Sequence, residues 1–354
     1  MLAVEKLWNR LRSGKPYFIA EAGVNHLGSF ELAERLIAEA AKAGAHAIKF
    51  QSYKAKNLCT KDAPRFWDWD GEVEKAGSQY DSYSLLDSFG ATEHAVLRDM
   101  CVSHGIDFMS TPFDNEATDY LDDLGVLAYK IASCDITNYD LLDHVGKKKK
   151  IVMLSTGASN LEEIEGAIKV LKNAGTDKIV VMHCNLKYPT DRSEINLSMI
   201  HSLRKKFGDD YVYGLSDHTR ETQTPSFSVA LGANVVEKHY TVDKTLGKSA
   251  DHWLSVDPSE VAEIVDSMDM AYVMMGSLGQ DKSATDSEIR AKKFARRSLV
   301  SLRKIEKGET ISRENMACKR PGTGISASEF FNYIGKKATR TIEDDCLLTE
   351  EDFK

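Results

Sequence analysis

Short apolar runs alternate along this chain with longer segments in which apolar residues recur every three or four positions. The first pattern is typical of buried β-strands and the second of amphipathic helices. The apolar runs, eight in number, are residues 17–24, 45–53, 107–113, 127–133, 151–157, 178–184, 211–218 and 234–240. Parallel neighbours in a sheet need a crossover connection, which is usually a helix. The alternation therefore predicts a parallel sheet covered by helices.

Eight strand–helix units between residue 17 and about residue 278 match the size of a (β/α)8 TIM barrel, an α/β fold. The alternative is an open, doubly wound sheet. No glycine-rich dinucleotide fingerprint follows the first strand, which favours the barrel. One connection, residues 54–90, is long and rich in aromatic residues. It is interpreted as a lid, a substrate wall or a subunit contact, and these three stay open.

The chain changes character near residue 280. Residues 1–280 are expected to form the barrel domain, and the polar residues 281–293 read as a linker. Residues 294–354 contain short β-type runs and form a small second domain. That length is near the lower limit for independent folding, so the small domain is expected to pack against the barrel or against a partner subunit.

Composition excludes several classes of protein. The formal net charge of the 354 residues is −8, with acidic and basic residues mixed, which does not favour nucleic acid. The six cysteines show no CxxC spacing, which suggests free thiols in a reducing cytoplasm. No apolar run approaches the roughly 18 residues of a membrane span, and the first residues lack the apolar core of a signal peptide. A cytoplasmic enzyme is expected.

Polar residues stand at the end of every predicted strand, where a TIM barrel places its active site. In chain order they are Glu21 and Asn25, Lys49 and Gln51, Thr111 (with Phe113), Lys130 and Ser133, Ser155, His183, Asn185 and Tyr188, Ser216, Asp217 and His218, and Glu237 and His239. Buried polar groups without partners cost several kcal/mol on the least forgiving scales. So many of them predict a polar cavity, filled by a ligand or by water.

Two of these strands end in histidines, His218 and His239. Alternation along a strand puts Glu237 on the same face as His239 and turns Lys238 the opposite way. Two imidazoles and a carboxylate that converge are a candidate divalent metal site. The alternative is that each histidine only caps its strand.

The rest of the predicted cavity suits an anion. Lys49, Lys130 and several hydroxyl groups are donors for phosphate and carboxylate. Together with a metal they suit a small, multiply anionic substrate such as phosphoenolpyruvate. Glu21 and Glu237 would then move protons or bind the hydroxyls of a sugar.

Ordered motifs cover nearly the whole chain: IAEAGVNHLGS, IKFQS, MSTPFD, YKIAS, LSTG, HCNLKYPT, GLSDHT, ALGANVVEKHYTVDKT and KRPGTGIS. In this order they resemble the sialic acid synthases, the family of N-acetylneuraminate, legionaminic acid and pseudaminic acid synthases. The resemblance implies a TIM barrel followed by an antifreeze-like (SAF) domain, in a domain-swapped homodimer. It also implies the condensation of phosphoenolpyruvate with an N-acylated hexosamine, with release of phosphate.

The resemblance also implies roles for individual residues. His218 and His239 would ligate a divalent metal, Mn²⁺ before Mg²⁺ or Co²⁺. The carboxylate of phosphoenolpyruvate would be held by Lys49, Thr111 and Ser216, its phosphate by Lys130, Ser133 and Ser155, and the sugar by Glu21, Gln51, Tyr188 and Asp251. Arg320 would come from the other subunit to hold the N-acyl group. Phe113 and Asn185 are further candidates for substrate binding.

The chain departs from the family pattern at a few positions. Leu186 occupies a position where a polar phosphate contact is expected, and Asn185 is a candidate replacement. Near Asp251, Lys248 and Trp253 would alter the sugar pocket. The sugar is left open between N-acetylmannosamine and a 2,4-diacetamido-trideoxyhexose.

Two other functions compete with this one. A metal-dependent barrel aldolase or hydrolase could use His218, His239 and Glu237, or a Schiff base on Lys49 or Lys130. A non-catalytic carbohydrate-binding protein could have kept the fold.

Overall fold

The structure, a computed structural model, describes residues 2–67, 77–247, 251–276 and 281–354. It divides into two compact units, Met1–Gly276 and Ser277–Lys354. The segment expected to be a linker, residues 281–293, contains a 3-10 turn at Asp286–Glu288 and the start of α12 (Ile289–Ala295).

The first unit contains one eight-stranded parallel sheet with strand order β3-β2-β1-β8-β7-β6-β5-β4. The strands are β1 (Tyr17–Gly23), β2 (Ala47–Ser52), β3 (Asp107–Pro112), β4 (Ala128–Ile131), β5 (Ile151–Ser155), β6 (Ile179–Cys184), β7 (Val212–Asp217) and β8 (Val235–His239). Strands β3 and β4, at the two ends of this order, pack against each other, so the barrel is nearly closed. The eight predicted strands and the TIM-like barrel are confirmed, and the open doubly wound sheet is wrong.

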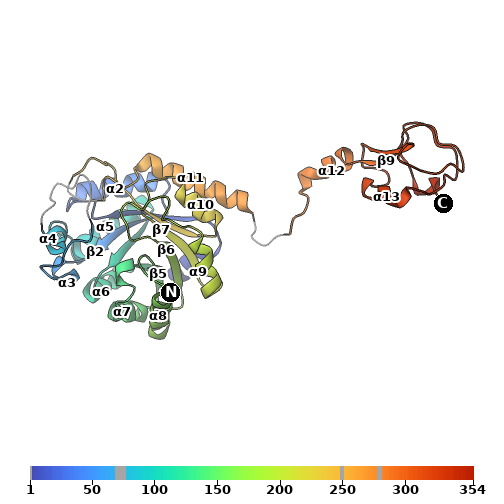
Figure 1. Ribbon diagram of the computed structural model, residues 1–354. Coiled ribbons are helices and arrows are strands. Elements are labelled where there is room, and N and C mark those ends of the chain that lie inside the picture. Colours follow the sequence, from blue (N-terminus) through green and yellow to red (C-terminus); the bar gives the residue numbers. More distant parts are fainter. Residues whose placement is uncertain (1, 68–76, 248–250, 277–280) are drawn as a thin grey trace. The chain divides into compact units, whose positions relative to one another are not determined.

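Helices surround the strands of this unit (Figure 1). They are α1 (Leu2–Arg12), α2 (Phe30–Lys42), α3 (Ala55–Leu58), α4 (Gln79–Ser84), α5 (Ala91–His104), α6 (Asn115–Asp123), α7 (Tyr139–Lys147), α8 (Leu161–Ala174), α9 (Met199–Phe207), α10 (Thr224–Ala230) and α11 (Pro258–Met275). Helix α2 shows why they form. The Ser29 side chain caps its first turn, and its apolar stripe, which includes Leu36 and Ile37, is buried against the barrel. Burial of each such side chain contributes about 1.5–3 kcal/mol.

Inward-facing side chains fill the barrel in layers. Near the amino ends they are apolar, and Leu7, Trp8 and Leu11 of α1 pack against them. Helix α1, which lies before the predicted elements, thus closes this end of the barrel. Two residues farther along strands β1 to β4 the inward positions become polar: Ile19 is followed by Glu21, Ala47 by Lys49, Met109 by Thr111 and Ala128 by Lys130. Because strand side chains alternate, the apolar layer fixes the direction of the polar one.

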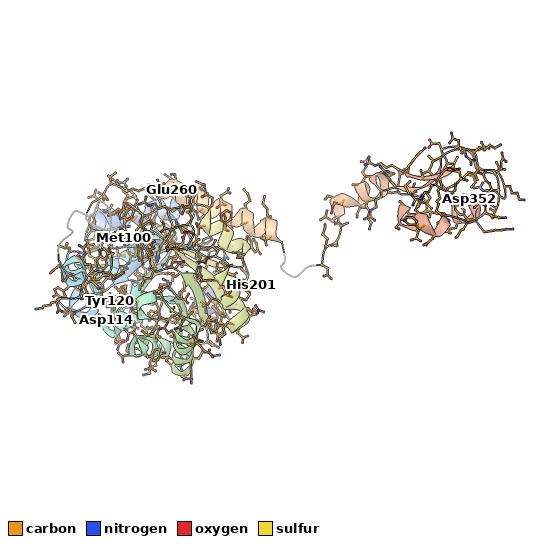
Figure 2. All side chains as sticks on the ribbon, viewed as in Figure 1. Met100, Asp114, Tyr120, His201, Glu260 and Asp352 are labelled. Carbon is orange, nitrogen blue, oxygen red and sulfur yellow. The ribbon has the colours of Figure 1, made fainter. Side chains whose placement is uncertain are left out.

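The second unit has a small core of its own around Leu299, Ile311 and Met316. Strands β9 (Ser298–Ser301) and β10 (Met316–Lys319) pair antiparallel, and the short helix α13 (Phe330–Tyr333) packs on them. Asp352, marked in Figure 2, is fully buried and receives hydrogen bonds from Thr349 N and Arg340 Nε, both at 2.7 Å. In the described part of the chain, no helix combines the length and apolar character needed to cross a bilayer.

Candidate active site

A pocket of about 850 Å³ opens at the carboxyl ends of the barrel strands. Among the residues of the first unit, the lining includes every residue predicted to act in catalysis or binding except Asn185. The predicted residues that line it are Glu21, Lys49, Gln51, Thr111, Phe113, Lys130, Ser133, Ser155, Tyr188, Ser216, His218, Glu237, His239 and Asp251. Residues from eight strand ends and the loops after them therefore share one cavity.

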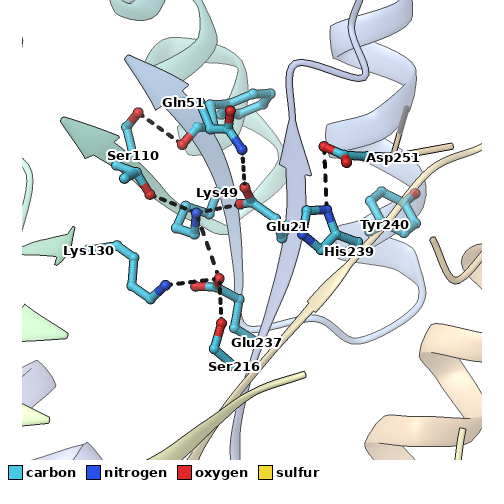
Figure 3. Close-up of polar contacts among 12 residues, drawn as sticks. Glu21, Lys49, Gln51, Ser110, Lys130, Ser216, Glu237, His239, Tyr240 and Asp251 are labelled. Atoms are coloured by element: carbon cyan, nitrogen blue, oxygen red, sulfur yellow. Dashed lines mark hydrogen bonds and ion pairs between the residues drawn. The ribbon is translucent and has the colours of Figure 1, made fainter. Parts of the chain in front are cut away.

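The pocket floor consists of Glu21, Lys49, Lys130 and Glu237, all at least 96% buried (Figure 3). Lys49 Nζ lies 2.6 Å from Glu21 Oε2 and donates a hydrogen bond to Thr111 Oγ1 at 2.8 Å. Gln51 Nε2 donates to the other oxygen of Glu21 at 3.1 Å. These contacts hold the Lys49 ammonium in one position at the bottom of the cavity.

Glu237 joins the two lysines of the floor. Its Oε1 receives Lys130 Nζ at 3.2 Å and Ser216 Oγ at 3.4 Å, and Lys49 Nζ lies 3.8 Å away. Its Oε2 is buried without a hydrogen-bond partner among the described residues. Such an atom is suited to meet a ligand or water in the pocket.

The two floor carboxyls differ in acidity. Burial raises the pKa of Glu21 to about 7, although the Lys49 charge opposes the shift. Burial also disfavours the charged form of Glu237, but Lys130 and Lys49 more than compensate and hold its pKa below the usual value. A pair of carboxyls with separated pKa values is typical of acid–base chemistry.

The imidazole pair, His218 and His239, stands beside the floor with ring centroids 5.4 Å apart. Tyr188 packs on His218 at 4.1 Å between centroids. The Nδ1 of His218 lies 2.7 Å from the Asn185 carbonyl oxygen, which can only accept a hydrogen bond. Burial opposes a charge on this ring, but Cys184 and the Asn185 carbonyl outweigh it and raise the pKa of His218. In the neutral ring Nδ1 carries the proton, and the Nε2 lone pair is available to a ligand.

The imidazole pair fits a divalent cation as two nitrogen ligands. Burial lowers the pKa of His239 well below its usual value, so this ring is neutral and can donate a lone pair. Asp251 Oδ2 lies 3.7 Å from His239 Nδ1. Within the described residues no group of three His, Cys, Asp or Glu side chains could hold a metal. Water or substrate would have to complete the coordination, as in catalytic sites with open positions.

The hydroxyl groups of Ser133 and Ser155 line the same pocket. The Gly157 N–H donates to Ser133 Oγ at 2.9 Å. A Cβ at position 157 would lie 2.8 Å from that oxygen, so the contact requires glycine. Ser155 Oγ is buried and has no hydrogen-bond partner among the described residues, which leaves it available to a bound anion.

Some strand-end residues serve other purposes. Asn185 does not line the pocket, because its side-chain amide donates to the Glu194 carbonyl oxygen at 3.0 Å. Its backbone orients His218 instead. Leu186 does line the pocket, at the position where a polar contact is expected. His183 is bound to the Ile195 carbonyl oxygen at 2.6 Å.

Asp217 also lies outside the pocket. Asp217 faces the opposite side of β7 from Ser216 and pairs with Lys238 at 2.7 Å. The expectation that Lys238 points away from the site is thus confirmed. Arg320 is an exposed residue of the second unit.

Several lining residues were not among the predicted ones. Cys184 follows Met182 in the inward row of β6, so strand alternation was a signal that could have found it. Cys134 and Asp135 lie in a single 3-10 turn, Lys244 lies in a loop, and the lining residues of the long connection after β2 lie in loops or in the short helices α3 and α4. Such short elements carry no periodic pattern, so no comparable signal existed for them.

Comparison with known proteins identifies the family of the chain. Residues 36–280 match the NeuB family, and residues 296–354 match the SAF domain. Two curated relatives are N,N'-diacetyllegionaminic acid synthases. The one from Campylobacter jejuni is 39% identical over 95% of this chain and 99% of its own length. The one from Legionella pneumophila is 37% identical over 95% of this chain and 94% of its own length.

A solved structure agrees as well. The N-acetylneuraminic acid (sialic acid) synthetase of Leptospira borgpetersenii superposes with a TM-score of 0.69 at 35% identity, over 78% of this chain and 90% of that chain. The resemblance to sialic acid synthases and the C-terminal SAF domain are confirmed. By its motifs, its barrel and its full-length relatives, this chain belongs to the NeuB family.

Proposed function

We propose that the chain condenses phosphoenolpyruvate with an N-acylated hexosamine aldehyde, giving a sialic-type nonulosonic acid and phosphate. The observation that carries the proposal is the pocket floor, where two buried lysines meet two carboxylates beside a pair of imidazoles. The names of the relatives, which are synthases of such acids, support the same reaction.

The donor substrate would bind along the lysines of the floor. Lys49, Thr111 and Ser216 are proposed to hold its carboxylate, and Lys130, Ser133 and Ser155 its phosphate. The hydrogen bond from Lys49 to Thr111 and the unpartnered Ser155 hydroxyl support this division. The ammonium groups of Lys49 and Lys130 can form charge-assisted hydrogen bonds, which are strong contacts for the carboxylate and phosphate of phosphoenolpyruvate.

The acceptor sugar would lie above the floor, next to the imidazole pair. Glu21, Gln51, Tyr188 and Asp251 are proposed to contact it, and all four line the pocket. Side-by-side binding of the two reactants makes their reaction effectively unimolecular, which supplies much of the rate acceleration.

The bond-forming step places C3 of the enol against the aldehyde carbon. As the C–C bond forms, positive charge develops at C2 and the aldehyde oxygen takes a proton from a floor carboxyl, which the attacking water restores in the next step. Water adds at C2 and gives a proton to Glu21 or Glu237, and the resulting intermediate loses phosphate by C–O cleavage. Overall, one enol phosphate, one aldehyde and one water are consumed, and one keto acid and one phosphate are formed.

A divalent metal, Mn²⁺ before Mg²⁺ or Co²⁺, is proposed to bind His218 and His239. When bound, it would polarise the sugar carbonyl as a Lewis acid. Treatment with EDTA is expected to reduce activity to background, and Mn²⁺ to restore it. In parallel, His239→Ala should abolish Mn²⁺ binding measured by calorimetry, whereas His201→Ala, an exposed histidine on α9, should not. Full activity in metal-free protein would contradict this assignment.

We further propose a domain-swapped homodimer in which Arg320 of one copy binds the N-acyl group of sugar held by the other. Arg320→Ala should raise the KM for the sugar about tenfold or more, since a charged hydrogen bond is lost. Mixing Arg320→Ala with His239→Ala protein should restore part of the activity, because one mixed site is intact. Absence of rescue, once subunit exchange is confirmed by native mass spectrometry, would show that each chain completes its own site.

The direct test is an assay of 2-keto-3-deoxy acid after incubation with phosphoenolpyruvate, Mn²⁺ and either N-acetylmannosamine or 2,4-diacetamido-trideoxyhexose. Product from at least one sugar is expected. No product from any hexosamine would count against the proposal. Trapping of Lys49 or Lys130 with borohydride and a keto acid would instead indicate an aldolase that works through a Schiff base.

A further inference from the structure

Arg320, the residue proposed to hold the N-acyl group, belongs to a short loop that directly follows β10. This loop, residues 320–324, is called the arginine loop. The Arg320 side chain is exposed, whereas the backbone of the loop is bonded to β9 and α12 of the same unit. Such bonds matter for binding, because ordering a mobile loop and a long side chain at a ligand weakens affinity.

Ser298, the first residue of β9, makes the central attachment of the arginine loop. It is fully buried. Its Oγ donates a hydrogen bond to the Pro321 carbonyl oxygen at 2.8 Å and accepts one from the Gly324 N–H at 2.9 Å. One hydroxyl group therefore uses both its donor and its acceptor capacity to join the two ends of the loop.

Helix α12 holds the arginine loop at a second point. The Gly322 N–H donates to the Lys293 carbonyl oxygen of α12 at 2.9 Å. A Cβ at position 322 would lie 2.8 Å from the Cβ of Arg296, so this close approach requires glycine. The end of the segment expected to be a linker is therefore bonded to the loop that carries Arg320.

We infer that Ser298 is a positioning residue for Arg320: its hydroxyl holds the arginine loop in the conformation that presents the guanidinium to the sugar. The inference rests on the proposed role of Arg320. Because Ser298 is fully buried, it can act on the sugar only through this loop. In Ser298→Ala the Pro321 carbonyl and the Gly324 N–H lose their partner. Other loop conformations then become populated, and a smaller fraction of molecules is ready to bind.

Strand β9 offers a matched control at its other end. Ser301 is also fully buried, and its Oγ donates to the Glu343 carbonyl oxygen at 2.6 Å and accepts the Cys346 N–H at 3.0 Å. Ser301→Ala thus removes the same two kinds of hydrogen bond from a different loop. Ser298→Ala is expected to raise the KM for the sugar about fivefold and to leave the KM for phosphoenolpyruvate within about twofold. Ser301→Ala should leave both within about twofold.

A double-mutant cycle separates positioning from a general loss of structure. Added to Arg320→Ala, Ser298→Ala should raise the KM for the sugar no further, because both act through one guanidinium. Gly322→Ala, which displaces the loop without changing Ser298, should raise the same KM and serves if Ser298→Ala does not fold. Equal effects of the two serine variants, or an additive rise in the cycle, would overturn the inference and leave the proposed function standing.

Hydrogen exchange provides a readout that does not depend on the reaction. The Gly324 amide should exchange faster in Ser298→Ala than in Ser301→Ala, because only the first variant removes its acceptor. Unchanged exchange at Gly324 would overturn the inference. Faster exchange, together with an unchanged KM for the sugar in Arg320→Ala, would confirm the attachment and refute the proposed role of Arg320 instead.

Discussion

Replacement of Lys130 by methionine is expected to lower kcat/KM for phosphoenolpyruvate by about 10²–10³-fold, the loss typical of one donor to a reacting oxyanion. Lys130 is 4% exposed, and its Nζ lies 3.2 Å from Glu237 Oε1. The variant loses a charge proposed to hold the phosphate. It also removes the nearest cation that keeps the pKa of Glu237 low. Steady-state kinetics with the phosphate donor varied will measure the loss.

A matched control is available on the same barrel. Lys148 pairs with Asp119 at 2.6 Å but does not line the pocket. Lys148→Met removes an equivalent lysine–carboxylate contact and should leave kcat/KM within about twofold, since exposed ion pairs contribute little. Near-normal kinetics in Lys130→Met would show that the phosphate binds elsewhere.

The second large effect is expected in stability. Lys238 and Asp217 form an ion pair that is about 99% buried on the side of β7 and β8 away from the pocket. Asp217→Asn leaves the lysine charge buried without its counter-charge, which should cost about 3–5 kcal/mol of unfolding free energy. Asp217 directly precedes His218 in the chain, and Lys238 directly precedes His239. The same variant should therefore also disturb the imidazole pair. Urea unfolding followed by tryptophan fluorescence measures the first effect.

The matched variant removes both charges. Asp217→Leu combined with Lys238→Met leaves no unpaired ion and should recover most of the lost stability, because a buried ion pair is often no better than apolar packing. A loss below about 1 kcal/mol in Asp217→Asn would show that water or another group compensates Lys238.

Much of the barrel could be predicted because one physical rule governs all eight strands. Strand side chains alternate, so the apolar row that fills the barrel also specifies which residues face the pocket two positions later. Ala47 and Ala128 face the barrel interior, so that rule alone predicts that Lys49 and Lys130, two residues later, face the pocket. The same rule separates Glu237, which faces the pocket, from Lys238, which does not.

Other features could not be read from the chain in this way. Asn185 follows a strand end, but its side chain turns to a loop carbonyl, a choice made by tertiary contacts after the strand has ended. Helix α1 packs beneath the barrel through three apolar residues, too few to distinguish it from a polar leader. Tyr83 reaches the pocket from α4, a helix of six residues, which is too short to show a periodic pattern in the sequence.

The central claim is that this pocket joins an enol phosphate to a sugar aldehyde. The most direct measurement follows phosphoenolpyruvate labelled with carbon-13 at C3 by NMR, in the presence of Mn²⁺ and each N-acyl hexosamine. The account predicts that the vinyl signal is replaced by that of a saturated CH₂ coupled to a sugar carbon, with one phosphate released per bond formed. Labelled pyruvate alone, or an unchanged vinyl signal with every sugar, would contradict it.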